Sequence, residues 1–227
     1  QYLSEQFADL RILRYQVPGF DELTLQQKTL LYYLSEAALC GRDIMWDQHY
    51  KYNLTVRKTL ENIVETYKGD RKSPEFDKFM EYTKRVWFSN GIHHHYSSDK
   101  IFPEFSKKYF TTLVGQSLSN GFPYNSNENE IEFIDRLTTV MFDPKVAPKR
   151  VNLDPKVDMV TNSAINFYEG VTQKEAEAFY KDANKNNPKT PVMTGLNTKL
   201  IKENGKIIEK TWKVGGMYTQ AIEQIVF

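Results

Sequence analysis

The 227 residues include 30 basic and 29 acidic side chains, which gives a formal charge of +1 at pH 7. This balance excludes the large basic surface with which proteins bind nucleic-acid phosphates. The hydrophobic share of 40% and aromatic share of 14% predict a globular chain with a substantial core. No apolar run approaches the roughly 18 residues of a membrane-spanning helix. We therefore expect neither nucleic acid nor a membrane span.

Cys40 is the only cysteine, so the chain forms no internal disulfide. We expect a cytoplasmic location, with an exported or periplasmic form left open. The chain begins at Gln1 rather than methionine, and an apolar helical face that includes Tyr218 and Ile222 continues to Phe227 without a stop signal. We therefore expect the chain to be part of a longer protein and its last segment to be incomplete.

A capping box predicts the first helix. Thr24 and Gln27 have the spacing at which the two side chains satisfy each other's backbone N–H groups. Leucine and alanine residues then repeat at intervals of three and four, as in an amphipathic helix. The pattern reaches about Leu39, and Gly41 stands at the expected end. Cys40 lies on or beside the apolar face, where a thiol usually packs as a small hydrophobic residue.

Two further helices are predicted from their caps. Asn53 is expected to cap a helix that ends just before Gly69. Asn53 also opens an Asn-x-Thr glycosylation signal, for which helix capping is the better explanation. Ser73, Pro74 and Glu75 follow the order of an N-cap, a first-turn proline and a first-turn acid, and open the next helix.

A proline-rich connection divides the chain. Residues 115–129 are rich in Ser, Asn and Gly and are expected to form a loop before a helix that includes 131–141. Three prolines make 143–158 an irregular connection. We interpret 1–142 as a helical subdomain and 159–227 as a mixed α/β segment.

The last third introduces strands. Thr172 and Glu175 form a second capping box that opens a short helix. The dipeptide Asn204-Gly205 suits a two-residue type I′ turn and predicts a hairpin over 198–212. The expected fold class is therefore α+β, predominantly helical with a small sheet near the C-terminus.

Three of the four histidines are consecutive, at 93–95. Neighbouring side chains diverge on a helix and alternate on a strand, so the three imidazoles cannot all reach one ion from regular structure. On an extended segment His93 and His95 share a face, but zinc takes three or four ligands, and His49 is the only other imidazole. We expect no native metal site. A polar loop that lines a cleft and structural hydrogen bonding both remain open.

No nucleophile elbow, dinucleotide fingerprint or phosphate-binding loop is present, so residue chemistry alone predicts no catalytic group. Four segments are distinctive, and they span most of the chain: Tyr32–Ala38 with Gly41–Asp43, Val86–Gly91 through Lys100–Pro103, Phe167–Thr172, and Gly195–Glu203. In order and separation they resemble the dipeptidyl peptidase III family of zinc exopeptidases, in its bacterial branch.

The resemblance implies a fragment. The family's zinc machinery is a helical His-Glu-x-x-x-His motif with a downstream Glu-Glu-x-x-Ala run, and neither occurs in this chain. The chain would therefore be the N-terminal part of the lower lobe, which faces the zinc lobe across a wide cleft and contains a small β-barrel. Zinc would belong to the parent protein with its ligands outside this chain. The fragment alone would be inactive, with no catalytic residue and no metal ligand.

The resemblance also implies a substrate-binding loop. In the family the loop at 90–97 reaches the cleft and lines the pocket for the N-terminal part of the peptide. The implied substrate-binding residues are Asn90, Gly91, His94, His95 and Tyr96. Better-studied relatives carry Asn-Tyr-Lys-Ser-Phe-Gly here, so this chain departs from that form. The expected partners are a peptide substrate and the C-terminal, zinc-bearing part of the same protein.

The alternative is a free-standing helical module that binds a peptide or protein without catalysis. An apolar patch left where the rest of a lobe would dock favours the fragment, and a closed polar surface favours the module.

Overall fold

The computed structural model describes residues 2–186, 189 and 197–227, so Gly195 and Leu196 of the last distinctive segment lie outside the described residues. The fold is mainly helical with two small sheets, which confirms the predicted α+β class. The helices are α1 (Leu25–Cys40), α2 (Arg42–His49), α3 (Asn53–Thr66), α4 (Pro74–Ser89), α5 (Lys107–Gly115), α6 (Glu130–Phe142), α7 (Gln173–Ala183) and α8 (Thr219–Val226). The strands are β1 (Leu3–Phe7), β2 (Leu10–Leu13), β3 (Tyr168–Glu169), β4 (Thr198–Glu203) and β5 (Lys206–Thr211).

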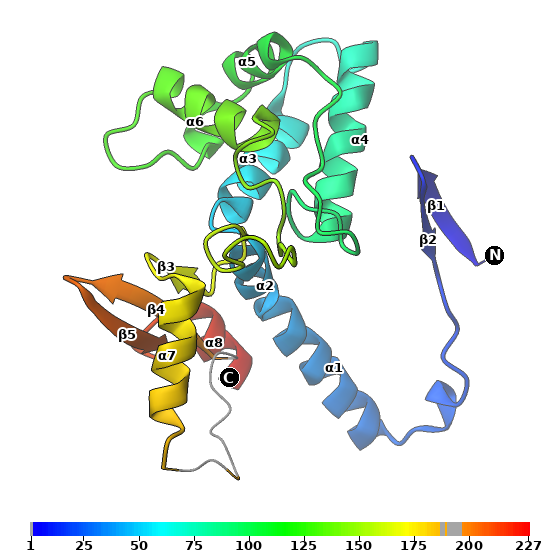
Figure 1. Cartoon of the computed structure of the whole chain (residues 1–227). Coiled ribbons are helices and arrows are strands. Elements are labelled where there is room, and N and C mark those ends of the chain that lie inside the picture. The colour runs from blue at the N-terminus through cyan, green and yellow to red at the C-terminus, as the bar shows by residue number, and fades with distance from the viewer. Residues whose placement is uncertain (1, 187–188, 190–196) are drawn as a thin grey trace.

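The main core lies among α3, α4, α5 and α6, which gather at one end of the molecule (Figure 1). Its centre is aromatic. The Phe79 ring lies 5.6 Å from that of Phe76 and 5.7 Å from that of Phe105, measured between centroids. Phe79 is fully buried, as are Phe110 of α5 and Phe133 of α6. This interdigitation of large rings is expected to supply most of the stability of the helical region.

The predicted caps of this region form as expected, with one exception. Thr24 caps α1 in a capping box with Gln27, and the Ser73 side chain accepts a hydrogen bond from the N–H of Phe76 at the start of α4. Asn53 does not cap α3, because Tyr52 precedes the helix and Asn53 is its first residue. The Asn53 side chain is fully buried and serves the neighbouring loop instead, which also removes it as a glycosylation acceptor in the folded chain.

The C-terminal sheet has the order β3-β4-β5. Asn204 and Gly205 have φ angles of 51° and 77°, as a type I′ turn requires, so the predicted hairpin is confirmed. Strand β3 runs parallel to β4 and was not predicted. Helix α7 packs on this sheet through a small second core that contains Ala176 and Leu200.

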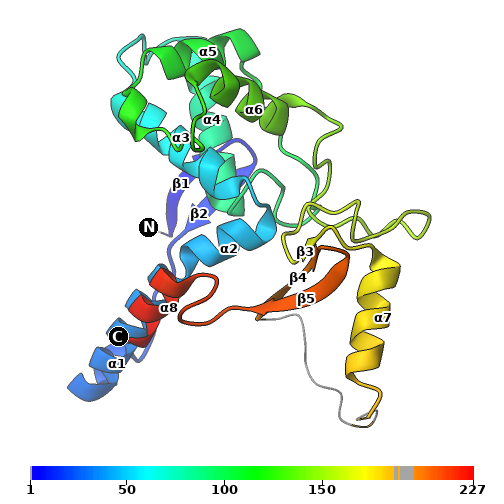
Figure 2. The ribbon, with the colours of Figure 1, turned by 90° about the vertical axis from the view of Figure 1, so that its left-hand side faces the viewer.

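Helix α1 differs from the other long helices because none of its residues is buried. It extends away from the main core, and α8 packs along it (Figure 2). Leu30 and Leu34 are 58% and 56% exposed. The prediction that this helix has a single apolar face is wrong, because apolar or aromatic residues fill five consecutive positions, 30–34, and so surround the helix. None of the described helices is long and apolar enough to cross a membrane.

Three elements outside the predictions complete the helical half. Only Gly41 separates α1 from α2. Gly41 keeps a right-handed helical backbone conformation, so the chain continues directly into a second helix. Helix α5 was also missed. The N-terminal β1–β2 hairpin lies beside α4, to which it is joined by the ion pairs Lys84–Glu5 at 2.5 Å and Arg85–Asp9 at 2.8 Å.

The two halves meet at α2. No helix or strand forms in the connection between α6 and β3. At the end of this connection, Asn166 N donates to Gln48 O at 2.8 Å, and Asn166 Nδ2 donates to Asp47 Oδ2 at 3.2 Å. The Tyr218 hydroxyl donates to the same Asp47 oxygen. One carboxylate of α2 therefore holds both the strand region and the start of α8.

Candidate functional site

The loop that follows α4 begins at a tightly packed root. Asn90 ends the helix in the left-handed conformation at φ 51°, and Gly91 follows at φ 146°. A Cβ atom on Gly91 would lie 2.2 Å from Asn53 Nδ2, so only glycine fits. Asn53 Oδ1 accepts from Ile92 N at 3.2 Å while Asn53 Nδ2 donates to Trp46 O at 3.1 Å. The root of the loop is thereby fixed to both α2 and α3.

His93 points into the protein. Its side chain is 1% exposed, and its Nε2 lies 2.8 Å from Ala147 O. A carbonyl only accepts hydrogen bonds, so Nε2 carries the proton and Nδ1, which has no partner among the described residues, does not. Burial lowers the pKa of His93 to about 4, against the opposing effect of the hydrogen bond to Ala147. His93 is therefore neutral at pH 7 and has a structural role.

Lys100 fixes the other end of the loop. Its backbone N donates to Pro148 O at 3.0 Å, and its Nζ donates to the carbonyl oxygens of Asp143 and Val146, each at 2.8 Å. Burial lowers the pKa of Lys100 to about 8. The loop is therefore held between its helix and the connection at 143–150, which makes it a rigid support for the residues at its tip.

The tip carries a cluster of rings at the surface. The His95 ring lies 5.0 Å from that of Phe88, 4.4 Å from that of His94 and 4.5 Å from that of Tyr96. Tyr96 is 86% exposed. Arg150 Nη2 donates to His95 O at 3.2 Å, and burial together with the nearby His94 and Arg150 charges lowers the pKa of His95. We call the set of Phe88, His94, His95, Tyr96 and Arg150 the ring cluster.

The ring cluster offers both stacking area and polar groups. A phenol presents a flat face and a hydroxyl, and a neutral imidazole presents one donor and one acceptor. His94 Nδ1 is already engaged, because it accepts from the backbone N–H groups of Tyr96 and Ser97, each at 3.2 Å. The arrangement suits an extended peptide, whose amides and side chains need both kinds of contact.

The structure divides the five predicted site residues into two groups. His94, His95 and Tyr96 come together at the tip. Asn90 and Gly91 lie at the root, where Asn90 O is 3.2 Å from His49 Nδ1 and Gly91 is buried. Sequence reasoning missed two members of the cluster. Phe88 lies within a segment that had been singled out, but Arg150 comes from a distant connection and gave no local signal.

No metal site forms from the histidine run. Among the described residues, no group of three or more His, Cys, Asp or Glu side chains is arranged to hold a metal ion. His93 is bound to Ala147 O, whereas His95 belongs to the surface cluster, so the two imidazoles that share a face of an extended segment do not converge here.

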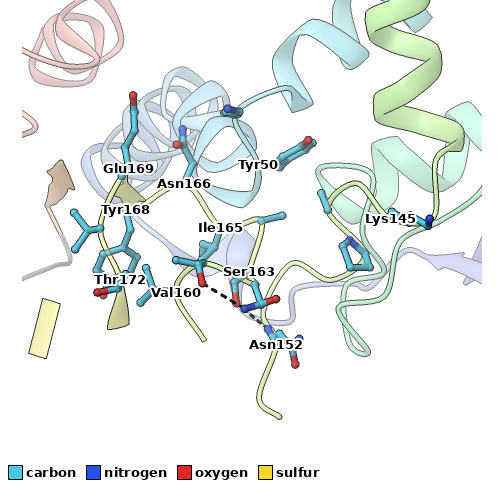
Figure 3. Close-up of a pocket in the computed structure, with 18 residues that line it drawn as sticks. Tyr50, Lys145, Asn152, Val160, Ser163, Ile165, Asn166, Tyr168, Glu169 and Thr172 are labelled. Carbon is cyan, nitrogen blue, oxygen red and sulfur yellow. Dashed lines mark hydrogen bonds between the residues drawn. The ribbon is translucent and has the colours of Figure 1, made fainter. Parts of the chain in front are cut away.

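A cavity of about 610 Å³ lies apart from the ring cluster (Figure 3). Tyr50, parts of the connection after α6, and the segment around β3 line it, whereas no residue of the ring cluster does. It sits where the helical half meets the sheet.

Comparison with protein-family models found no match, and comparison with curated proteins found none either. What this chain does is therefore inferred from its own residues and geometry.

Proposed function

We propose that this chain is the N-terminal, substrate-side part of a zinc-dependent dipeptidyl peptidase, which removes dipeptides from the N-termini of peptides. The four distinctive segments that resemble the dipeptidyl peptidase III family support the proposal. The zinc-bearing part of the same protein would lie C-terminal to residue 227 and face the ring cluster across a cleft.

The observation that carries the proposal is the exposed apolar surface of α1. A helix that is apolar on all sides is normally buried within a larger structure. Here α8 covers one side only, and α8 itself has no buried residue. The leucine and tyrosine side chains at positions 30–34 of α1 are 44% to 65% exposed. A contiguous apolar surface of this kind favours a docking partner over a free-standing module.

In this proposal the ring cluster holds the N-terminal part of the peptide. Tyr96 stacks on the peptide, and His95, whose Nδ1 is buried, uses its Nε2 to hydrogen-bond a peptide carbonyl or amine. The described residues do not fit zinc, since they contain no suitable group of ligands. The role of this chain is therefore to bind and orient the substrate, and zinc held by the other part of the protein would supply the activation of water.

A module that binds peptides without catalysis remains the second candidate, because the ring cluster would serve it equally well. The two candidates differ in what the longer gene product does. We would measure dipeptide release from a dipeptidyl-naphthylamide substrate by this polypeptide and by the longer product, each with added zinc.

Activity in the longer product alone is the expected result. Activity in neither favours the binding module, and activity in this polypeptide contradicts the assignment of zinc to the other part. In the longer product, Tyr96→Ala should raise KM about tenfold, the effect of losing roughly 1.4 kcal/mol of binding. Tyr15→Ala is the matched control, because Tyr15 is similarly exposed at 79% but lies outside the cluster.

A further inference from the structure

The 610 Å³ cavity has a size typical of ligand sites in proteins. It does not include the ring cluster, so an inference about it does not rest on the proposed peptidase function. In Figure 3, Tyr50 and Lys145 lie on one side of the cavity, and Tyr168 and Glu169 lie on the other. Three properties of this lining point to one class of ligand.

The first property is an open sheet edge. Strand β3 is one of the two edge strands of its sheet, and it pairs in parallel with β4. Leu200 N donates to Phe167 O at 2.9 Å, and Leu200 pairs with Tyr168. In a parallel ladder alternate residues bond to a given neighbour, so the N–H and C=O of Tyr168 face away from β4. Tyr168 lines the cavity. Its outward backbone groups make no hydrogen bond among the described residues, so they can pair with an extended chain.

The second property is a tyrosine hydroxyl without a hydrogen-bond partner among the described residues. Tyr50 is 6% exposed and lines the cavity. Within the described part of the chain its Oη makes no hydrogen bond, and it is not one of the fully buried unpaired atoms, so the hydroxyl remains accessible. Burial raises the pKa of Tyr50, so the hydroxyl keeps its proton and remains a donor. It is suited to donate to a carbonyl or carboxylate oxygen of a ligand.

The third property is the charge of the lining. Lys51 and Lys145 are the lysines among the lining residues, and Glu169 is the only carboxylate. Glu169 is neutralised by an ion pair with Lys199 at 2.6 Å. Neither Lys51 nor Lys145 forms an ion pair among the described residues, and both are exposed. The cavity therefore presents net positive charge and favours an anionic ligand.

We propose that this cavity binds a short, extended, acidic peptide segment. The backbone of the peptide pairs with the N–H and C=O of Tyr168, the Tyr50 hydroxyl donates to the peptide, and a peptide carboxylate lies near Lys145. Backbone pairing supplies orientation, and the charge of the lysine selects acidic sequences.

The test uses a defined probe with this polypeptide. Fluorescence anisotropy measures the binding of a dye-labelled peptide, Glu-Val-Thr-Val-Glu with an amidated C-terminus, and of its Lys-Val-Thr-Val-Lys counterpart. A third peptide carries an N-methyl group on the central amide, which blocks donation to Tyr168 O. We expect the acidic peptide to bind, and both other peptides to bind at least about tenfold more weakly, a difference of 1.4 kcal/mol.

Two variants locate the binding. Lys145→Glu should weaken the acidic peptide about tenfold or more, and its control is Lys72→Glu, another exposed lysine without an ion pair, which lies between α3 and α4. Tyr50→Phe should weaken binding about threefold to tenfold, the effect of one hydrogen bond. Its control is Tyr82→Phe, which removes a tyrosine hydroxyl that has no partner among the described residues and lies outside the cavity lining.

Loss of binding in Lys145→Glu with retention in Lys72→Glu supports the site, as does a change in the NMR signal of the Tyr168 amide. Equal affinity for the acidic and the N-methylated peptides would overturn the strand-pairing model. No binding of the acidic peptide, or unchanged binding in Lys145→Glu, would overturn the proposal as a whole. Lys145 is a surface residue, so this variant stays informative if Tyr50→Phe fails to fold.

Discussion

Helices α1 and α4 have the same length in residues, and each begins with a well-formed N-cap, yet their surroundings are opposite. Helix α4 buries Phe76, Phe79, Tyr82 and Val86 along one side. Helix α1 buries nothing. The buried apolar residues of α4 recur at intervals of three or four, whereas apolar and aromatic residues of α1 are consecutive at 30–34 and face every direction. A single neighbouring layer can cover the first pattern but not the second.

The comparison shows that local signals form a helix independently of whether its apolar residues find a partner. Capping and propensity act over one or two turns, and burial depends on the rest of the molecule. The stability of the chain should therefore reside in α3 to α6, and the exposed side of α1 should be available for docking. The following four predictions test this difference, in order of expected size.

The largest effect is expected in the aromatic core. Phe79→Ala should lower the free energy of unfolding by about 4 kcal/mol, because a fully buried ring is lost and a cavity is left. Leu34→Ala, at a site 56% exposed, should change it by less than about 0.5 kcal/mol. Urea denaturation of both variants measures the contrast. Similar losses at the two sites would mean that α1 is covered in solution.

The next effect is expected at the root of the loop. Gly91→Ala should lower the free energy of unfolding by about 3 kcal/mol, because it combines an unfavourable φ of 146° with a collision against Asn53. Gly115→Ala is the control, since a Cβ there meets no atom within 4 Å. It should leave stability unchanged or slightly raised. Thermal unfolding of both variants checks the prediction, and a mild effect of Gly91→Ala would show that the root rearranges freely.

A third prediction concerns pH. His93 takes up a proton near pH 6.5 when unfolded but only near pH 4 when folded. The unfolded chain therefore binds more protons between these values, and stability falls as the pH falls. From pH 6.5 to 4.5 the free energy of unfolding should fall by about 2 kcal/mol because of His93, and His93→Gln should abolish this part of the pH dependence. Denaturation curves at several pH values test it, and identical slopes in the two proteins would count against a buried neutral His93.

The smallest effect is expected for the N-terminal hairpin. Its described ties to α4 are two surface ion pairs and a contact between the Lys84 ammonium and the Phe7 ring. Surface ion pairs contribute little and are screened by salt. Arg85→Gln should leave the free energy of unfolding nearly unchanged and raise the hydrogen-exchange rates of the β1 and β2 amides. Adding 0.5 M NaCl to the unmodified chain should have the same effect on these amides. Exchange in α3 is the internal control. Protection of the hairpin that persists in the variant would indicate that the Lys84–Glu5 pair, the Lys84–Phe7 contact or a further contact holds it.

Features set by neighbours in sequence were predictable. The caps at Thr24, Ser73 and Thr172 and the Asn204-Gly205 turn depend on groups within three residues of each other, and all form as expected. Features set by distant partners were not predictable. Asn53 looked like a cap, but its side chain bonds to Ile92 N, 39 residues away. The α5 helix and strand β3 are also short, so local propensity carried little information about them.

The candidate site follows the same rule. His94, His95 and Tyr96 were identifiable because they are adjacent in the sequence, and Tyr96 is highly exposed as a binding residue requires. Arg150 joins them across 55 residues and could be found only in the folded chain. The cavity beside β3 was not anticipated, because Tyr50 and Tyr168 meet only when the halves of the molecule come together.

The shared carboxylate of Asp47 also bears on the order in which the chain folds. Its partners, Asn166 and Tyr218, lie 119 and 171 residues further along the sequence. Contacts of such separation carry a large loop-closure entropy and form late unless other structure brings the ends together. The helices from α3 to α6 are close in sequence and are expected to assemble first. Docking of the sheet and α8 onto Asp47 would then be the final, slower step of folding.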